Sequence, residues 1–120
     1  MTSWRLKIRF WGVRGSLPTP VRENLGFGGN TACVEMQSSA GDTVIFDAGS
    51  GIMGLGRHMI QQSGDQPLDI HLFMSHFHWD HVLGLPFFAP IYQAKNAVTI
   101  YSGPSTAPLK PAMQGVLSAP

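Results

Sequence analysis

The sequence is poor in several features, and each absence excludes a class of protein. The 120 residues include one cysteine, so no disulfide can form within the chain. Charged residues make up 12% and the net charge is +1, which favours neither nucleic acid nor a membrane as a partner. No apolar run reaches the roughly 18 residues of a membrane span, and the first residues lack the apolar core of a signal peptide. We therefore expect a cytoplasmic protein, with nucleic-acid binding left open.

Hydrophobic residues make up 43% of the chain, which is typical of a globular domain and not of a disordered tail. Sparse charge indicates faces that are covered in the folded protein. Strands are expected at residues 5–11, 31–37, 43–46, 68–74 and 98–101, and helices at 52–62 and within 104–117. The first strand alternates basic with apolar residues, and we expect its basic side to face solvent or an edge.

The most informative segment follows the strand at 68–74. His76, His78, Asp80 and His81 place four potential metal ligands in the order H-x-H-x-D-H. His76 and His78, two apart in extended backbone, point to the same side, and the other two follow where the chain turns. Imidazole and carboxylate donors without thiolate suit Zn²⁺, with Mn²⁺ or Fe²⁺ as alternatives. The segment predicts a metal site, the alternative being a histidine-rich surface turn.

The H-x-H-x-D-H loop resembles the hallmark of the metallo-β-lactamase superfamily. The segment 46–49, Phe-Asp-Ala-Gly, is similar to the superfamily's Asp-x-Gly motif at a strand end. The segments 11–16 (W-G-V-R-G-S), 28–33 (G-G-N-T-A-C) and 84–88 (G-L-P-F-F) resemble the ribonuclease Z-like and cyclic-phosphodiesterase-like branches. The likeness covers nearly the whole chain.

The resemblance implies an α/β (α+β) fold, the αββα sandwich, with its metal site between two halves. Members of the superfamily take a further His, a bridging Asp and a final His from the second half. After His81 this chain contains no His, Asp or Glu. We therefore expect residues 1–120 to form the N-terminal portion of one metallo-β-lactamase domain, with the C-terminal half as its missing partner.

The activity implied by the resemblance is metal-assisted hydrolysis, most readily of a phosphodiester or another small-molecule substrate, at a dinuclear zinc centre. His76 and His78 would hold the first metal, and Asp80 and His81 the second, with Asp80 also orienting the nucleophilic water. Thioester or lactam hydrolysis is an alternative. Another is a non-catalytic metal-binding fragment, and we expect the 120-residue chain alone to be inactive.

Other polar residues are assigned supporting or structural roles. Asp47 is interpreted as site-supporting, with a turn cap as the alternative, and Asn30 as fixing a loop beside the site. Arg14 is either a phosphate contact or a solvated side chain. We expect His58 and His71 to be structural. Three further side chains, Cys33, Phe77 and Trp79, are expected to be buried, the two aromatic ones anchoring the ligand loop in the core.

Overall fold

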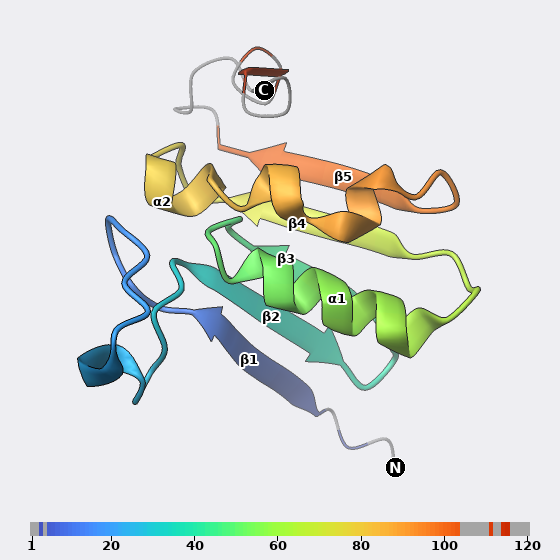
Figure 1. The fold of residues 1–120 in the computed structure, drawn as a ribbon. Helices are drawn as coiled ribbons and strands as arrows, with labels where there is room; N and C mark the ends of the chain where they lie inside the picture. The colour runs from blue at the N-terminus through green and yellow to red at the C-terminus, as the bar shows by residue number, and fades with distance from the viewer. Residues whose placement is uncertain (1–2, 4, 104–110, 112–113, 116–120) are drawn as a thin grey trace.

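A computed structural model describes residues 3, 5–103, 111 and 114–115 and shows one mixed sheet with helices on one of its faces (Figure 1). The strands of the five-stranded sheet lie in the order of the sequence. They are β1 (Leu6–Gly12), β2 (Cys33–Ser38), β3 (Thr43–Phe46), β4 (Asp69–Met74) and β5 (Ala97–Ser102). The helices are α1 (Ile52–Ser63) and α2 (Trp79–Val82), with 3₁₀ helices η1 (Arg22–Asn24), η2 (Leu85–Phe87) and η3 (Ala89–Tyr92).

The sheet combines two kinds of connection. β1, β2 and β3 form an antiparallel meander, and the turn at residues 38–42 joins the last two. β4 and β5 are each parallel to the preceding strand, so helical connections cross one face of the sheet, α1 first and then α2 to η3. Because β3 and β4 are parallel neighbours, the loops that follow them emerge at the same edge of the sheet.

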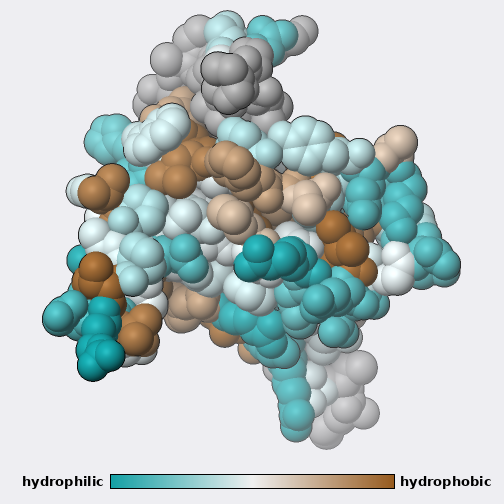
Figure 2. Space-filling view, viewed as in Figure 1, coloured by the Kyte–Doolittle hydropathy of each residue, from teal (hydrophilic) through white to brown (hydrophobic). Residues whose placement is uncertain are grey.

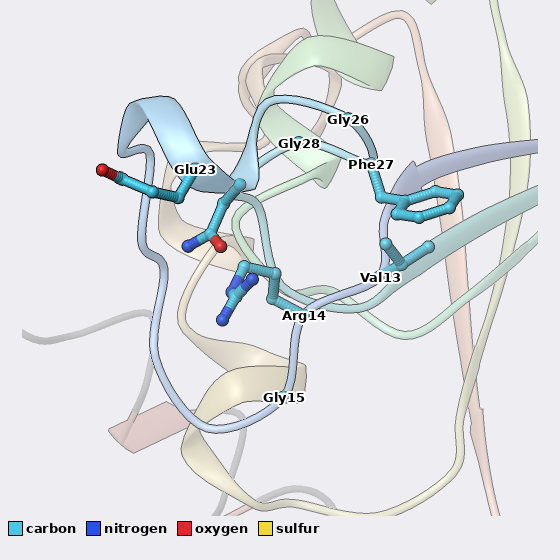
Figure 3. Close-up of a pocket in the computed structure, with 8 residues that line it drawn as sticks. Val13, Arg14, Gly15, Glu23, Gly26, Phe27 and Gly28 are labelled. Atoms are coloured by element: carbon cyan, nitrogen blue, oxygen red, sulfur yellow. The ribbon is translucent and has the colours of Figure 1, made fainter.

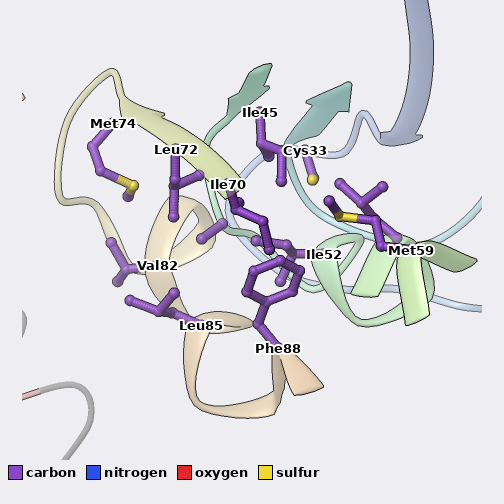
Figure 4. Packing of buried hydrophobic residues seen from close by; sticks show 12 residues of the cluster. Cys33, Ile45, Ile52, Met59, Ile70, Leu72, Met74, Val82, Leu85 and Phe88 are labelled. Carbon is purple, nitrogen blue, oxygen red and sulfur yellow. The ribbon is translucent and has the colours of Figure 1, made fainter. Parts of the chain in front are cut away.

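The core lies between this helical layer and the sheet (Figure 4). Ile45, Ile70 and Leu72 project from the central strands and are fully buried. They belong to the same cluster as Ile52 and Phe88 of the covering layer. Alternating β-branched residues in the strands and apolar residues three or four apart in α1 create these two complementary surfaces. The helix side of the molecule is mostly hydrophilic over α1, with hydrophobic groups on the surface at the end where η1 lies (Figure 2).

The opposite face of the sheet is not covered by any described residue and carries a continuous row of apolar side chains. The strand registers align Phe10, Val34, Phe46, Phe73 and Tyr101, one residue from each strand. Phe73 stacks on Tyr101 with ring centroids 4.3 Å apart, and Phe46 lies 5.9 Å from Phe73. We call these five residues the open-face row. Four of the five, Phe10, Phe46, Phe73 and Tyr101, are exposed, so the row leaves apolar side chains open on this face.

The strands and α1 lie where the sequence predicts them, within two residues at each end. α2 and the 3₁₀ helices were not predicted, and most of the helix expected within 104–117 lies outside the described residues. β1 is an edge strand, but its apolar side is more open than expected: Phe10 is 67% exposed, whereas Arg9 is half-buried and bonded to His58. Within the described part of the chain, no helix is long and apolar enough to cross a membrane.

Candidate metal centre

The ligand loop begins where β4 ends and leads directly into α2. His78 is the extended residue before the helix (φ −62°, ψ 149°), so the chain turns between His78 and the Asp80–His81 pair. The structure brings the imidazoles of His76, His78 and His81 together. The His76 ring centroid lies 4.4 Å from that of His78 and 4.0 Å from that of His81. A strand end and a short helix thus place three aromatic nitrogen donors on one side of the loop.

Asp80 is held beside this group by the loop that follows β1. The backbone N–H of Ser16 donates a hydrogen bond to Asp80 Oδ2 at 2.9 Å, and His81 Nε2 lies 3.4 Å from the same oxygen. The Ser16 hydrogen bond lowers the pKa of the Asp80 carboxyl below its usual range, and the nearby His81 and His76 add to this effect. Asp80 is therefore a carboxylate at neutral pH, as a metal ligand must be.

Asp47 lies beneath the loop and contacts it through both carboxylate oxygens. Ser75 donates its backbone N–H to Oδ1 at 2.8 Å and its hydroxyl to Oδ2 at 2.7 Å. Ser75 Oγ is also 2.9 Å from His76 Nδ1. Because the Ser75 hydroxyl proton is donated to Asp47, His76 must donate its Nδ1–H to Ser75 Oγ. This tautomer leaves His76 Nε2 with a free lone pair for a metal.

The same carboxylate reaches a second histidine. Asp47 Oδ2 lies 2.9 Å from His81 Nδ1, within ion-pair distance. The ring direction does not align the N–H with the oxygen, however, and Nδ1 is a buried nitrogen without a hydrogen-bond partner among the described residues. Asp47 adopts a left-handed backbone conformation (φ 63°), which Asp and Asn tolerate better than most residues. This conformation turns the chain at the end of β3 and aims the carboxylate at the ligand loop.

The glycine of the Asp-Ala-Gly segment allows two backbones to meet below the site. Ala48 N–H donates to His81 O at 2.8 Å, and Gly84 N–H donates to Ala48 O at 2.9 Å. A Cβ on Gly49 would lie 2.5 Å from the carbonyl oxygen of Asp80, and one on Gly84 would lie 2.1 Å from Gly49 O. Side chains at these two positions would push α2 away from the loop that carries Asp47.

Asn30 fixes the neighbouring loops and contacts none of the histidines. Its side-chain Oδ1 accepts a hydrogen bond from Ser50 Oγ at 3.0 Å, and its carbonyl accepts the N–H groups of Val13 and Arg14. Thr31, fully buried, exchanges hydrogen bonds with Ser50. These contacts link the loops that contain Val13, Asn30 and Ser50, and the supporting role of Asn30 at the site stays a prediction.

The two histidines expected to be structural lie away from the ligand cluster. Of the two aromatic side chains expected to anchor the ligand loop, one packs against the core and the other does not. His71 contacts Tyr101 on the open face, and His58 contacts Arg9. Phe77 packs against the core, but Trp79 is 65% exposed and does not anchor the loop, because its position begins the helix on the solvent side. The expectation for Trp79 was wrong.

Cys33 is fully buried, as predicted. Burial raises the pKa of its thiol, and the charges of Asp47 and Glu35 raise it further. The thiol therefore stays protonated at neutral pH and is not a candidate ligand.

Two residues of the site were given no role from the sequence. Ser75 connects Asp47 to His76, and Ser16 holds Asp80 through its backbone N–H. For Ser75 the sequence does carry a signal, because the residue lies between the last residue of a buried strand and the first candidate ligand. A backbone contact such as that of Ser16 leaves no trace in side-chain chemistry.

The chemistry of the donors fits zinc, but their number does not complete a site. Among the described residues, no group of three or more His, Cys, Asp or Glu side chains is placed to hold one ion. His76 and His78 form one neighbouring pair, and His81 with Asp80 forms another. Catalytic zinc keeps three protein ligands, so each pair is one donor short.

Comparisons with known proteins found one family match and several similar proteins. The sequence pattern of the family described as the Metallo-beta-lactamase superfamily matches residues 26–112. Ribonuclease Z of Haloarcula marismortui is 35% identical over 81 residues, which are 68% of this chain and 22% of that protein. Ribonuclease Z of Pyrococcus abyssi is 29% identical over 106 residues, 85% of this chain and 30% of that protein. The chain thus spans about a quarter of the length of these relatives, and no solved structure matches it.

Proposed function

The chain belongs to the metallo-beta-lactamase superfamily, and on that premise we propose that it carries the ligand loop of a metal-dependent phosphodiesterase. The observation that carries the proposal is the convergence of three imidazoles and the Asp80 carboxylate above Asp47. The similarity to proteins named ribonuclease Z supports a phosphodiester as the bond that is cleaved.

His76 and His78 would hold one metal ion, and Asp80 and His81 a second. Zinc is the preferred ion because imidazole and carboxylate donors suit it, with Mn²⁺ or Fe²⁺ as alternatives. Bound ions of this kind lower the pKa of water toward neutrality and neutralise charge that develops on a phosphoryl oxygen.

The residues of this chain prepare the site for that chemistry. Asp47, through Ser75, fixes the tautomer in which His76 Nε2 is free, and it lies against His81 Nδ1. The Ser16 hydrogen bond keeps Asp80 ionised and fixes its Oδ2. Asp80 is thereby available as a ligand and as the group that orients the attacking water.

The missing donors belong to the proposal as well. Since each pair of donors is one short of three, we propose that a segment outside residues 1–120 supplies the remaining ligands. The open-face row provides an apolar surface on which that segment would pack. We refer to residues 1–120 followed by such a segment as the extended chain.

The test is hydrolysis of bis(p-nitrophenyl) phosphate with added Zn²⁺ or Mn²⁺, measured for the 120-residue chain and for the extended chain. Turnover by the extended chain alone is expected. A thioester and a β-lactam are assayed in parallel. Faster hydrolysis of either one than of the phosphodiester would make that compound class the proposed substrate instead. Turnover by the 120-residue chain itself would contradict the proposed need for outside ligands.

A further inference from the structure

A small hollow lies between α1 and the sheet, at the strand ends opposite to the ligand loop. It has a volume of about 180 Å³. Thr43, the first residue of β3, and Leu68, which immediately precedes β4, both line it. The ligand loop instead follows the last residue of β4, which is parallel to β3 (Figure 1). The hollow is therefore separate from the candidate metal centre, and the proposed function gives it no role.

Glu35 is a buried carboxylate that lines this hollow. It is 2% exposed, and its Oε2 accepts a hydrogen bond from Trp11 Nε1 at 2.9 Å. No described residue donates a hydrogen bond to Oε1, and no described lysine or arginine forms an ion pair with the carboxylate. Oε1 is not sealed from solvent, so the hollow gives a ligand access to it. A buried charge that no cation neutralises is costly, and a cationic ligand would offset that cost.

Arg9, which lies directly opposite Glu35 in the β1–β2 register, does not neutralise it. The register places both side chains on the α1 face of the sheet. The guanidinium is instead held toward α1, because Arg9 Nη1 lies 3.2 Å from His58 Nε2. Its Cζ also lies 5.3 Å from the centre of the Trp11 ring, whose N–H is bonded to Glu35. The indole thus contacts both charged groups, and they do not pair with each other.

The other walls of the hollow suit a short apolar chain that ends in a cation. Gln37 of β2 and Gln62 of α1 line it with amide groups, whereas Met59 and Leu68 add apolar side chains. An ammonium group has three N–H donors and no acceptor, which matches a free carboxylate oxygen and amide carbonyls. A water molecule takes up roughly 30 Å³ in the liquid, so this volume admits a ligand of about six non-hydrogen atoms.

We propose that this hollow binds a primary alkylammonium group, which donates a charge-assisted hydrogen bond to Glu35 Oε1. A free amine and a lysine side chain of another protein present the same group. None of the residues that line the hollow is a candidate metal ligand, so the site does not depend on the proposed phosphodiesterase function.

The test is equilibrium dialysis of the 120-residue chain against radiolabelled n-butylamine, in phosphate buffer with EDTA. EDTA removes metal ions that could bind the amine, and dialysis gives an affinity whether or not the chain associates. Saturable binding at millimolar concentration is expected. Radiolabelled n-butanol, which has the same size without the charge, should bind at least about tenfold more weakly. Equal binding of the alcohol, or no saturable binding of the amine, would overturn the proposal.

A second ligand separates the two sources of the ammonium group. Nα-acetyllysine methylamide carries the same group on a peptide-like backbone. Binding of both compounds would support the proposal and extend the site to lysine side chains of a partner protein. Binding of n-butylamine alone would support the proposal and restrict the site to free amines.

Three variants that each remove one charge locate the site. Glu35→Gln keeps an acceptor for the Trp11 N–H and should weaken n-butylamine binding about tenfold. Arg9→Gln removes the neighbouring cation and should strengthen binding about threefold. Glu23→Gln is the matched control and should leave binding unchanged, because Glu23 is exposed and lines a different hollow (Figure 3).

Circular dichroism shows whether each variant is folded, and the comparison of the amine with the alcohol requires no variant at all. Unchanged binding in the Glu35 variant, or an equal loss in the Glu23 variant, would overturn the assignment to this hollow. Weaker binding in the Arg9 variant would show that the ligand needs the guanidinium, and it would overturn the assignment of a cationic ligand.

Discussion

Asp47 and His81 meet at 2.9 Å between Oδ2 and Nδ1, although no hydrogen bond aligns them. The same carboxylate oxygen accepts the Ser75 hydroxyl that leads to His76. One buried carboxylate therefore contacts His81 directly and reaches His76 through Ser75, and these two histidines are assigned to different metal ions. This arrangement makes Asp47 the residue whose charge should affect both ions at once.

Replacing Asp47 by Asn should lower zinc affinity of the extended chain about 10–100-fold, as loss of a carboxylate that orients a ligand usually does. Asn tolerates the left-handed conformation, so the fold should persist. Zinc affinity is measured by competition with a chelating dye. Asp69→Asn, an exposed carboxylate on β4, is the control. Unchanged affinity in the Asp47 variant would contradict the supporting role.

Replacing Asp80 by Ala should lower the turnover of the extended chain by at least about 10²-fold, because a metal ligand and a water-orienting group are lost together. His71→Ala, on the open face, should leave turnover nearly unchanged. The measurement is the initial rate on bis(p-nitrophenyl) phosphate. Equal losses in the two variants would mean that the ligand cluster is wrongly assigned.

Replacing Gly49 by Ala should destabilise the 120-residue chain by about 1–3 kcal/mol, because the added methyl would overlap the carbonyl of Asp80. Gly15→Ala is the matched control, since a Cβ there meets nothing within 4 Å. Urea denaturation gives both free energies of unfolding. A stability loss no larger than that of the control would refute the close backbone approach.

Stability should fall as the pH rises above the usual thiol pKa of about 8.5, because Cys33 keeps its proton when folded and loses it when unfolded. A raised folded-state pKa has this sign: the contribution is complete at lower pH and is lost toward alkaline pH. Urea denaturation between pH 7 and pH 10 measures it. Cys33→Ala should flatten the alkaline decline, and an equal slope in that variant would exclude the thiol as its cause.

The open-face row should cause the 120-residue chain to associate. Phe73→Lys should shift the chain toward monomer on a sizing column without unfolding it, because the ring lies on the uncovered face. Leu72→Lys, one residue earlier on the covered face, should instead unfold the chain, since an unpaired charge would be buried in the core. A wild-type chain that elutes as a monomer would contradict the prediction.

The sequence predicts the strands and α1 well, because alternation and three-to-four spacing are local signals. It does not predict which side of β1 is covered, because that depends on where α1 crosses the sheet. Arg9 lies on the α1 side through His58, 49 residues away in the sequence. The four candidate ligands were identified from residue type and spacing, and their role as ligands stays a prediction. The link from Asp47 through Ser75 to His76 required the parallel pairing of β3 with β4, which no local pattern reveals.

The sheet order also bears on how the protein is made. Each strand after β1 pairs with the strand that precedes it in the sequence, so its partner is already synthesised when it forms. The segments between paired strands range from the turn at residues 39–42 to the 22 residues of 47–68 and of 75–96, so the entropic cost of closing each loop is modest. A chain emerging from the ribosome could therefore build this sheet strand by strand. The histidine loop would then be in place before any later segment reached it.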